Sequence, residues 1–207
     1  MSGPVKRIYL ASRSPRRREL LKQLGVSFEV LLFRETVRRG AADVDETPQA
    51  SERPEDYVQR LACAKAQAGA LHMGQRKLPV HPVLGADTTV AIAGRILGKP
   101  ENQDDAIAML SALAGRTHEV LTAVVLCRQD TLTTRLSLSE VVIAPLTETQ
   151  IRAYVATGEP MDKAGAYAIQ GRAGAFVRRL SGSYTGVMGL PLFETAELLK
   201  TLALTPP

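Results

Sequence analysis

The chain opens with a short apolar run that leads directly into a helix, and this order most constrains the fold. Ile8–Ala11 is apolar and is followed by the turn Ser12–Pro15. Ser14 is a favourable N-cap and the proline after it suits the first helical position, so we expect a helix over Arg16–Leu24. Ser27–Phe33 then predicts a second strand. A strand, turn, helix and strand in this order are typical of α/β proteins.

The rest of the chain continues this alternation of helices and strands. The sequence first predicts a polar loop over 34–53, a helix that begins at Pro54 and a buried strand from Val83 that continues to Ala93. It next predicts a helix capped by Asn102 and a hairpin of Thr117–Cys127 with Leu132–Ile143. The last predicted elements are a helix from the capping box at Thr147 to Ala156, a glycine-rich stretch over 158–189 and a helix over Pro191–Leu202. Leu61, Ala64, Ala68 and Leu71 are expected to form the apolar face of the Pro54 helix. We therefore expect one α/β domain, residues 1–207, with a cleft.

Composition and charge narrow the classes of protein. The 45% share of hydrophobic residues excludes a disordered chain, and the net charge of +5 indicates an anionic partner. That partner is a nucleic acid, an anionic membrane or a phosphorylated small molecule. No apolar stretch approaches the ~20 residues of a membrane span. Cys63 and Cys127 lack disulfide or metal spacing and are interpreted as core residues, so we expect a soluble protein of a reducing compartment.

The turn after the first strand is the first candidate binding site. Ser12 and Ser14 supply hydroxyls, and Arg16, Arg17 and Arg18 follow. A helix N-terminus with hydroxyl and guanidinium groups favours phosphate binding, and arginine binds phosphate oxygens in pairs. The same residues also fit a capped helix with solvated arginines, and the local pattern leaves both readings open.

A second candidate is Asp87, which follows a buried apolar run. A carboxylate on such a strand is held rigidly and can bind Mg²⁺ or orient water, although an Asx turn explains it equally well. Lys99 lies just beyond the next turn and can return to the same cleft. The alternating acids of Asp43–Thr47 suit a hard cation or a solvated loop. In the segment 162–171, Gln170 can both donate to and accept from a base edge, or the segment is simply a loop of small residues.

Taken in order, these segments resemble the motifs of the Maf-like nucleotide pyrophosphatases. The matching segments are Leu10–Arg17, Asp43–Thr47, Arg60–Ala66, Gly85–Thr88, Gly98–Pro100, Gly115–His118, Asp162–Tyr167, Ile169–Gly171 and Val187–Pro191. Each segment is weak alone, but the ordered set covers nearly the whole chain and is specific. Arg13 and Ala168 are minor departures, and the segment 72–82 fits no motif.

The resemblance implies a fold, a reaction and partners. The fold is an elongated mixed β-sheet with flanking helices, in two lobes around a cleft, similar to inosine triphosphatases. The reaction is cleavage of a nucleoside triphosphate to the monophosphate and pyrophosphate with a divalent cation, Mg²⁺ or Mn²⁺. The family also implies a cytoplasmic homodimer that removes unwanted nucleotides, with no nucleic acid and no membrane as a partner.

The resemblance also implies the residues of the site. Asp87 matches the catalytic carboxylate, and Ser12, Arg17, Glu46, Lys65 and Lys99 match the other polar cleft positions. Ser12 and Arg17 are expected to hold the triphosphate, Lys65 and Lys99 to neutralise phosphate charge, and Glu46 with Asp87 to hold the metal. Arg16, Thr88 and Gln170 mark the branch that acts on dTTP and UTP, where they are expected to shape the base pocket. Asp87 can act as base, as metal ligand or as both.

Two alternatives remain at this point. One is a nucleic-acid-binding module, based on the sequence pI of about 9.4 and the Ser14–Arg18 turn. The 4% aromatic content offers few stacking platforms for that reading. The other is a triphosphatase of the same fold with broader or purine specificity.

Overall fold

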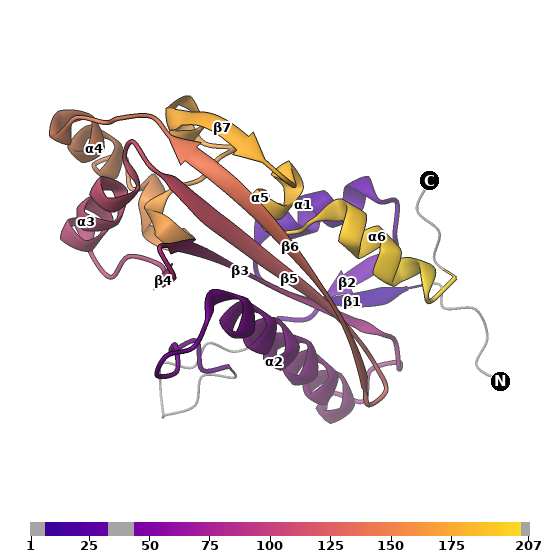
Figure 1. The fold of residues 1–207 in the computed structure, drawn as a ribbon. Helices are drawn as coiled ribbons and strands as arrows, with labels where there is room; N and C mark the ends of the chain where they lie inside the picture. Colours follow the sequence, from indigo (N-terminus) through magenta and orange to yellow (C-terminus); the bar gives the residue numbers. More distant parts are fainter. Residues whose placement is uncertain (1–6, 33–43, 204–207) are drawn as a thin grey trace.

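A computed structural model describes residues 7–32 and 44–203. Seven strands of this part form one mixed sheet in the order β2-β1-β3-β5-β6-β7, with β4 paired to β3 (Figure 1). The strands are β1 (Ile8–Ala11), β2 (Phe28–Val30), β3 (Val83–Ile92), β4 (Arg95–Leu97), β5 (Thr117–Arg128), β6 (Thr131–Ile143) and β7 (Val177–Ser181). The parallel β2-β1-β3 pairs and the antiparallel remainder confirm the expectation of a mixed α/β fold.

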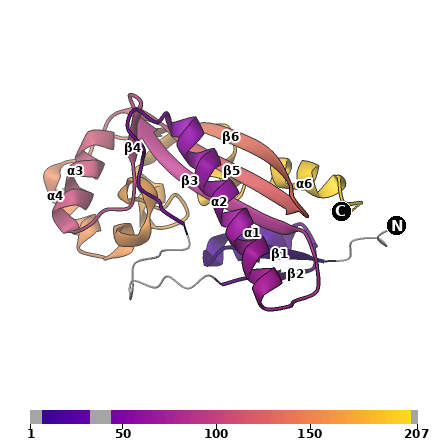
Figure 2. The same ribbon diagram turned by 90° about the horizontal axis from the view of Figure 1, so that it is seen from below.

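Helices cover both faces of the sheet. They are α1 (Pro15–Gln23), α2 (Pro54–Gln75), α3 (Gln103–Leu113), α4 (Glu148–Val155), α5 (Tyr184–Met188) and α6 (Leu192–Lys200), with short 3₁₀ turns over Glu159–Asp162, Ala164–Ala166 and Arg172–Phe176. Helix α2 runs along one face, α1, α5 and α6 lie on the other, and α3 with α4 stands at the end away from β1 and β2 (Figures 1 and 2). No helix of residues 7–32 and 44–203 is both long enough and apolar enough to cross a bilayer.

Local capping signals are confirmed. The Ser14 side chain accepts from the Arg17 N–H, Asn102 caps α3, and the capping box of Thr147 with Gln150 begins α4. The predicted hairpin is β5 with β6. These elements form where predicted because each depends on residues that are neighbours in the sequence.

The predicted apolar face of α2 is wrong in part. Leu71 is 61% exposed, whereas Ala62 and Ala66 are fully buried. The reason is the close approach of α2 to Gly85, where an added Cβ would lie 2.7 Å from Ala62 O and from Ala66 N. Next to Gly85 the small side chains therefore face the sheet, while Leu61 is buried as predicted and Leu71 lies outside the contact.

Three other expectations need correction or fall outside the described chain. The second strand is shorter than predicted, over Phe28–Val30. Phe33 lies outside the described residues, as does the first half of the predicted loop, residues 34–43. Strand β7 and helix α5 were not predicted within the glycine-rich stretch.

An open stretch of strand edge in the middle of β3 positions the site. On one edge, β1 pairs with Val83–Gly85 and β4 pairs with Val90–Ile92. Between these pairings, residues 86–89 pair with β5 on the other edge of β3, and no described strand pairs with them on this edge. Since side chains alternate along a strand, Asp87 faces α2 and Thr88 faces the opposite side. Both faces of the strand can therefore reach a space at this edge.

Two hydrophobic cores lie along the face of the sheet opposite α2. One contains Ala86 and is covered by α1 and α6, and the other contains Val90 and is covered by α3 and α4. Between them, Thr88, Thr122 and Ser137 stand in register across β3, β5 and β6. A belt of hydroxyls therefore divides the apolar layer into two parts, with the open edge of β3 at the boundary.

Candidate functional site

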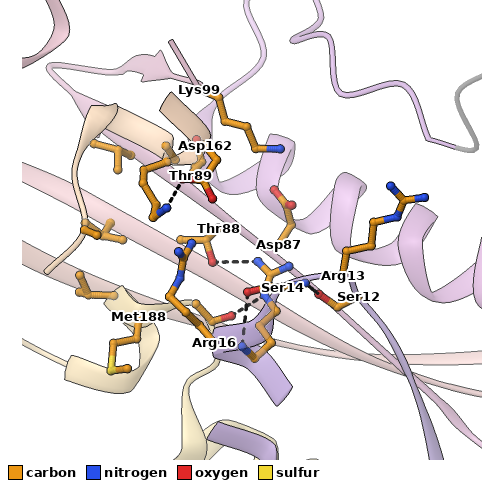
Figure 3. Close-up of a pocket in the computed structure, with 18 of the residues that line it drawn as sticks. Ser12, Arg13, Ser14, Arg16, Asp87, Thr88, Thr89, Lys99, Asp162 and Met188 are labelled. Atoms are coloured by element: carbon orange, nitrogen blue, oxygen red, sulfur yellow. Dashed lines mark hydrogen bonds and ion pairs between the residues drawn. The ribbon is translucent and has the colours of Figure 1, made fainter. Parts of the chain in front are cut away.

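A pocket of about 390 Å³ opens at the free edge of β3. Its wall contains all nine residues expected from the sequence: Ser12, Arg16, Arg17, Glu46, Lys65, Asp87, Thr88, Lys99 and Gln170. The labelled side chains of Ser12, Asp87, Thr88 and Lys99 surround one space (Figure 3). Residues that are up to 158 positions apart in sequence therefore meet in one place.

The α2 side of the pocket holds two carboxylates and two ammonium groups. Lys65 Nζ lies 2.5 Å from Asp87 Oδ1 and 2.7 Å from Glu46 Oε1. Lys99 Nζ lies 3.6 Å from Glu46 Oε2. Burial alone would raise the pKa of Glu46, but the charges and hydrogen bonds of Lys65 and Lys99 hold it below its ordinary value. Glu46 is therefore a carboxylate at neutral pH.

Helix α2 carries Lys65 and determines where this cluster lies against β3. Lys65 lies beside Ala66, which packs on Gly85 two residues before Asp87. The hydroxyl of Tyr57, which also belongs to α2, donates to the Glu46 carbonyl oxygen at 2.9 Å. Burial, with the nearby charges of Asp87 and Glu46, raises the pKa of Tyr57 to about 12. Tyr57 is therefore a neutral donor that ties the segment before α2 to the helix.

The turn between β1 and α1 forms the facing wall. The Ser14 N–H donates to Ser12 Oγ at 3.2 Å, and the Arg17 N–H donates to Ser14 Oγ at 3.4 Å. The hydroxyl of Ser12 keeps its own proton for another acceptor. Ser12 is 6% exposed and lines the pocket. The turn thus presents a hydroxyl beside the N-terminus of α1, the geometry expected of a phosphate site.

The Arg17 guanidinium is bound to the protein. Its Nε donates to the Gly189 carbonyl oxygen at 2.7 Å, and its Nη2 donates to Thr88 Oγ1 at 3.1 Å. Thr88 and Thr122 oxygens lie 2.9 Å apart, and Thr122 donates to the Gly186 carbonyl oxygen at 2.8 Å. Because Thr122 uses its proton there, Thr88 donates to Thr122. These four hydrogen bonds form one network that links α1, β3, β5 and α5.

Burial lowers the pKa of Arg17, while the Asp87 charge acts in the opposite direction. The group combines a partly buried charge with contacts that fix the pocket wall. Thr88, expected to shape the base pocket, has its hydroxyl engaged on both sides and therefore contributes a rigid surface.

The predicted acidic loop contributes less than its sequence indicates. Glu46 lines the pocket, but Asp45 does not. Asp45 Oδ1 accepts from the Thr47 N–H at 2.9 Å, and this bond lowers the Asp45 pKa. Asp43 lies outside the described residues. Of the described acids in this loop, only Glu46 therefore lies where it could bind a hard cation in the pocket.

The residues present fit a cation that arrives with a polyanionic ligand. No group of three or more His, Cys, Asp or Glu in residues 7–32 and 44–203 is arranged to hold a metal. Mg²⁺ is commonly held by one or two carboxylates, substrate phosphate oxygens and water. Glu46 and Asp87 meet that requirement, since one ammonium group lies within hydrogen-bond distance of both.

Sequence reasoning gave no role to several side chains that line the pocket, among them Arg13, Tyr57, Asp162 and Lys163, although the segment Asp162–Tyr167 matches a motif. Asp162 and Lys163 form an ion pair with each other, and the Lys163 side chain is 13% exposed. Adjacent opposite charges in a glycine-rich segment are the signal that could have indicated them. Arg13 was treated as a departure from the motif, although its neighbours Ser12 and Ser14 form the pocket turn.

A family model and the most similar curated relatives place this chain in one family. The family model described as "Maf-like protein" matches residues 7–202. A "dTTP/UTP pyrophosphatase" of Aromatoleum aromaticum is 60% identical over 94% of this chain and 95% of that protein. The proteins of the same description from Dechloromonas aromatica and Nitrosomonas europaea are 54% and 55% identical, over 97% and 93% of this chain and 99% and 93% of theirs. Among solved structures, the Staphylococcus aureus Ham1 protein aligns with a TM-score of 0.44 and 17% identity, over 67% of this chain and 72% of that one.

Proposed function

Since this chain belongs to the Maf-like family, we propose that it hydrolyses dTTP and UTP to the monophosphate and pyrophosphate. The relatives that match nearly its full length carry that description. We further propose that residues 1–207 act as one domain, with Mg²⁺ or Mn²⁺ as cofactor, as a cytoplasmic homodimer that removes unwanted pyrimidine nucleotides.

The observation that carries the proposal is that Lys65 contacts both Asp87 and Glu46 at the open edge of β3. Breaking a phosphoanhydride depends mainly on positioning and on charge neutralisation. Lys65, Lys99 and the helix N-terminus at Ser12 offer positive groups on opposite walls of one pocket. Two carboxylates lie between them, 2.5 and 2.7 Å from Lys65 Nζ.

Each residue has a defined part in this reaction. Ser12 and the first turn of α1 bind phosphate oxygens, while Arg17 keeps that wall in place. Asp87 orients the attacking water and accepts its proton as the new P–O bond forms. Lys65 and Lys99 neutralise the phosphate oxygens and the departing pyrophosphate. A divalent cation held by Glu46 and Asp87 would supply further neutralisation of the triphosphate charge.

The base is recognised by Gln170, which offers a donor and an acceptor to the pyrimidine edge. Arg16 and the rigid surface of Thr88 line the same pocket as Gln170 and Asp87 and shape it. The part of the pocket around Gln170 is its base side.

Asp87→Asn tests the proposal because the amide keeps the size of the side chain and loses its basicity. We expect the variant to fold normally and to lose at least about 10²-fold in kcat/KM on dTTP and UTP, since general-base catalysis contributes about that much. Release of pyrophosphate is measured over a panel of pyrimidine and purine triphosphates with Mg²⁺, alongside an Asp45→Asn control that lies outside the pocket.

Near-full activity of Asp87→Asn would remove Asp87 from the mechanism. Equal wild-type rates on purine triphosphates would favour the broader triphosphatase. Tight, salt-sensitive oligonucleotide binding without hydrolysis would favour a nucleic-acid-binding module.

A further inference from the structure

A buried histidine lies behind the base side of the pocket and takes no part in the proposed chemistry. His118 belongs to β5 and is 2% exposed. Its Nε2 lies 2.8 Å from the Tyr167 hydroxyl oxygen, and the two rings meet edge to face at 5.4 Å. Its Nδ1 is buried with no hydrogen-bond partner. His118 does not line the pocket, but Tyr167 does.

The unpartnered Nδ1 leaves a single hydrogen bond to hold the ring. The tautomer of His118 sets its direction: the Tyr167 hydroxyl donates to Nε2, or the Nε2–H donates to the hydroxyl oxygen. Burial also lowers the pKa of His118 to about 4, so the ring is neutral at physiological pH. A neutral ring with one donor and no route to the pocket does not act as the acid or base.

Tyr167 lies three residues before Gln170, and its side chain is buried in the core. The chain reaches it through Gly165 and Ala166, both with positive φ, of 66° and 59°. A positive φ at alanine is uncommon and persists where surrounding contacts enforce it. Residues 167–170 belong to no helix or strand, and a turn in which the Gly171 N–H donates to the Ala168 carbonyl oxygen at 3.0 Å closes directly after Tyr167.

The contacts upstream of Tyr167 fix one end of this segment. The Gly165 N–H donates to the Gly98 carbonyl oxygen at 3.0 Å, and Gly165 packs against Val90, where an added Cβ would lie 2.9 Å from Cγ1. The Tyr167 ring is 6% exposed and belongs to the same core as Val90. His118 supplies the directional contact that sets where this ring lies.

We propose that His118 is a positioning residue for base recognition: by holding Tyr167 against β5, it places Gln170 to read the pyrimidine edge. This inference rests on the proposed function, because it concerns the base side of the same pocket. It assigns a specificity role to a side chain that cannot touch the nucleotide.

Kinetics of His118→Leu and Tyr167→Phe test the proposal. Both remove the hydrogen bond and keep an apolar side chain in the core. We expect KM for dTTP and UTP to rise about fivefold, the preference over purine triphosphates to fall by a similar factor, and kcat to stay within about twofold, since weakened uniform binding raises KM alone. Gln170→Ala should change the same two quantities in the same direction.

Three further variants separate positioning from general stability. The double variant His118→Leu with Tyr167→Phe should show no more than the larger single effect, because both remove one interaction. His118→Gln keeps a donor and should restore part of the preference. Thr195→Val is the matched control: Thr195 is fully buried and donates to the Pro191 carbonyl oxygen at 2.6 Å, but it does not line the pocket. It should lower the melting temperature and leave KM unchanged.

Folded variants with unchanged KM and preference would overturn the proposal, and so would a fall in kcat at constant KM. An equal KM increase in Thr195→Val would also overturn it, because the effect would then follow stability. If the wild type fails to hydrolyse dTTP and UTP, the proposed function itself fails, which is a separate and earlier result in the same assay.

Discussion

Among single residues, the hydrogen-bonded polar side chains in and behind the pocket wall have the clearest physical consequences. Arg17 and Thr88, both partly buried, make hydrogen bonds to protein atoms. His118 is satisfied at one nitrogen and is kept neutral by burial. Neutral burial of a titratable group links folding to pH, because the unfolded chain can bind a proton that the folded chain excludes.

Acid should destabilise the protein through His118. Its pKa is about 4 in the folded chain against 6.5 in solution, so between these values the unfolded chain binds more protons. The contribution is complete above about pH 6.5, and the free energy of unfolding falls as pH drops towards 4, by about 3 kcal/mol in all. Urea unfolding at several pH values measures this loss.

His118→Leu is the control for that measurement, since leucine cannot titrate. The variant should show a shallower fall in stability between pH 6.5 and 4 than the wild type. Parallel curves for the two proteins would show that His118 does not cause the acid sensitivity.

Among elements, the contact between α2 and β3 determines how the catalytic cluster is held. Gly85 lies within van der Waals contact of the α2 backbone, and Lys65 and Asp87 extend from the two sides of this contact. The distance between helix and strand therefore sets the distance between ammonium and carboxylate.

Gly85→Ala should disturb stability and activity together. The added Cβ would lie 2.7 Å from backbone atoms of Ala62 and Ala66, which cannot rotate away, so α2 must shift. Overpacking of this kind costs about 1–3 kcal/mol, and displacement of a reacting group by ~1 Å can cost about 10²-fold in rate. Thermal unfolding and kcat/KM measure the two effects.

Gly74→Ala is the matched control because Gly74 belongs to the same helix and has nothing within 4 Å of an added Cβ. It should leave kcat/KM unchanged. Unchanged kcat/KM in Gly85→Ala as well would show that α2 can move without displacing Lys65.

Across the whole molecule, the charge surplus is concentrated at the pocket. Six of its lining residues are basic, namely Arg13, Arg16, Arg17, Lys65, Lys99 and Lys163, whereas three are acidic, namely Glu46, Asp87 and Asp162. A cleft with a surplus of one sign attracts ligands of the opposite sign, and salt screens this attraction.

The apparent affinity for a triphosphate should therefore fall as salt is added. We expect kcat/KM to decrease several-fold between about 50 mM and 500 mM salt, because added salt shortens the Debye length and screens the attraction between the pocket and the triphosphate. Arg13→Gln should reduce this dependence, whereas Arg95→Gln, at an exposed position outside the pocket, should not. A salt-independent wild type would contradict the role of the charge surplus.

Much of the fold could be predicted from the sequence because its signals are local. Ser14, Asn102 and Thr147 cap helices through residues three positions away. Strand β7 could not be predicted, since Val177–Ser181 lacks apolar alternation and forms through pairing with the distant β6. The exposure of Leu71 likewise depends on Gly85, which lies on another element.

The site could be predicted as a set of residues but not as a network. Ordered motifs indicated Asp87, Lys65 and Glu46, and the structure places them in one pocket. The bond from Arg17 to Gly189 joins residues 172 positions apart, and no local pattern contains it. The roles of these residues stay predictions until the variants are measured.

The open edge of β3 has a consequence for how the chain can tolerate insertions and deletions. Neighbouring residues of a strand point to opposite sides, so one residue added between Gly85 and Asp87 would exchange the sides of Asp87 and Thr88. The carboxylate would then leave Lys65 and face Thr122, and no rearrangement of loops could restore it. We therefore expect length variation in related chains to occur in the connections, for example the turn Gln129–Asp130 of the hairpin, and not in this part of the strand.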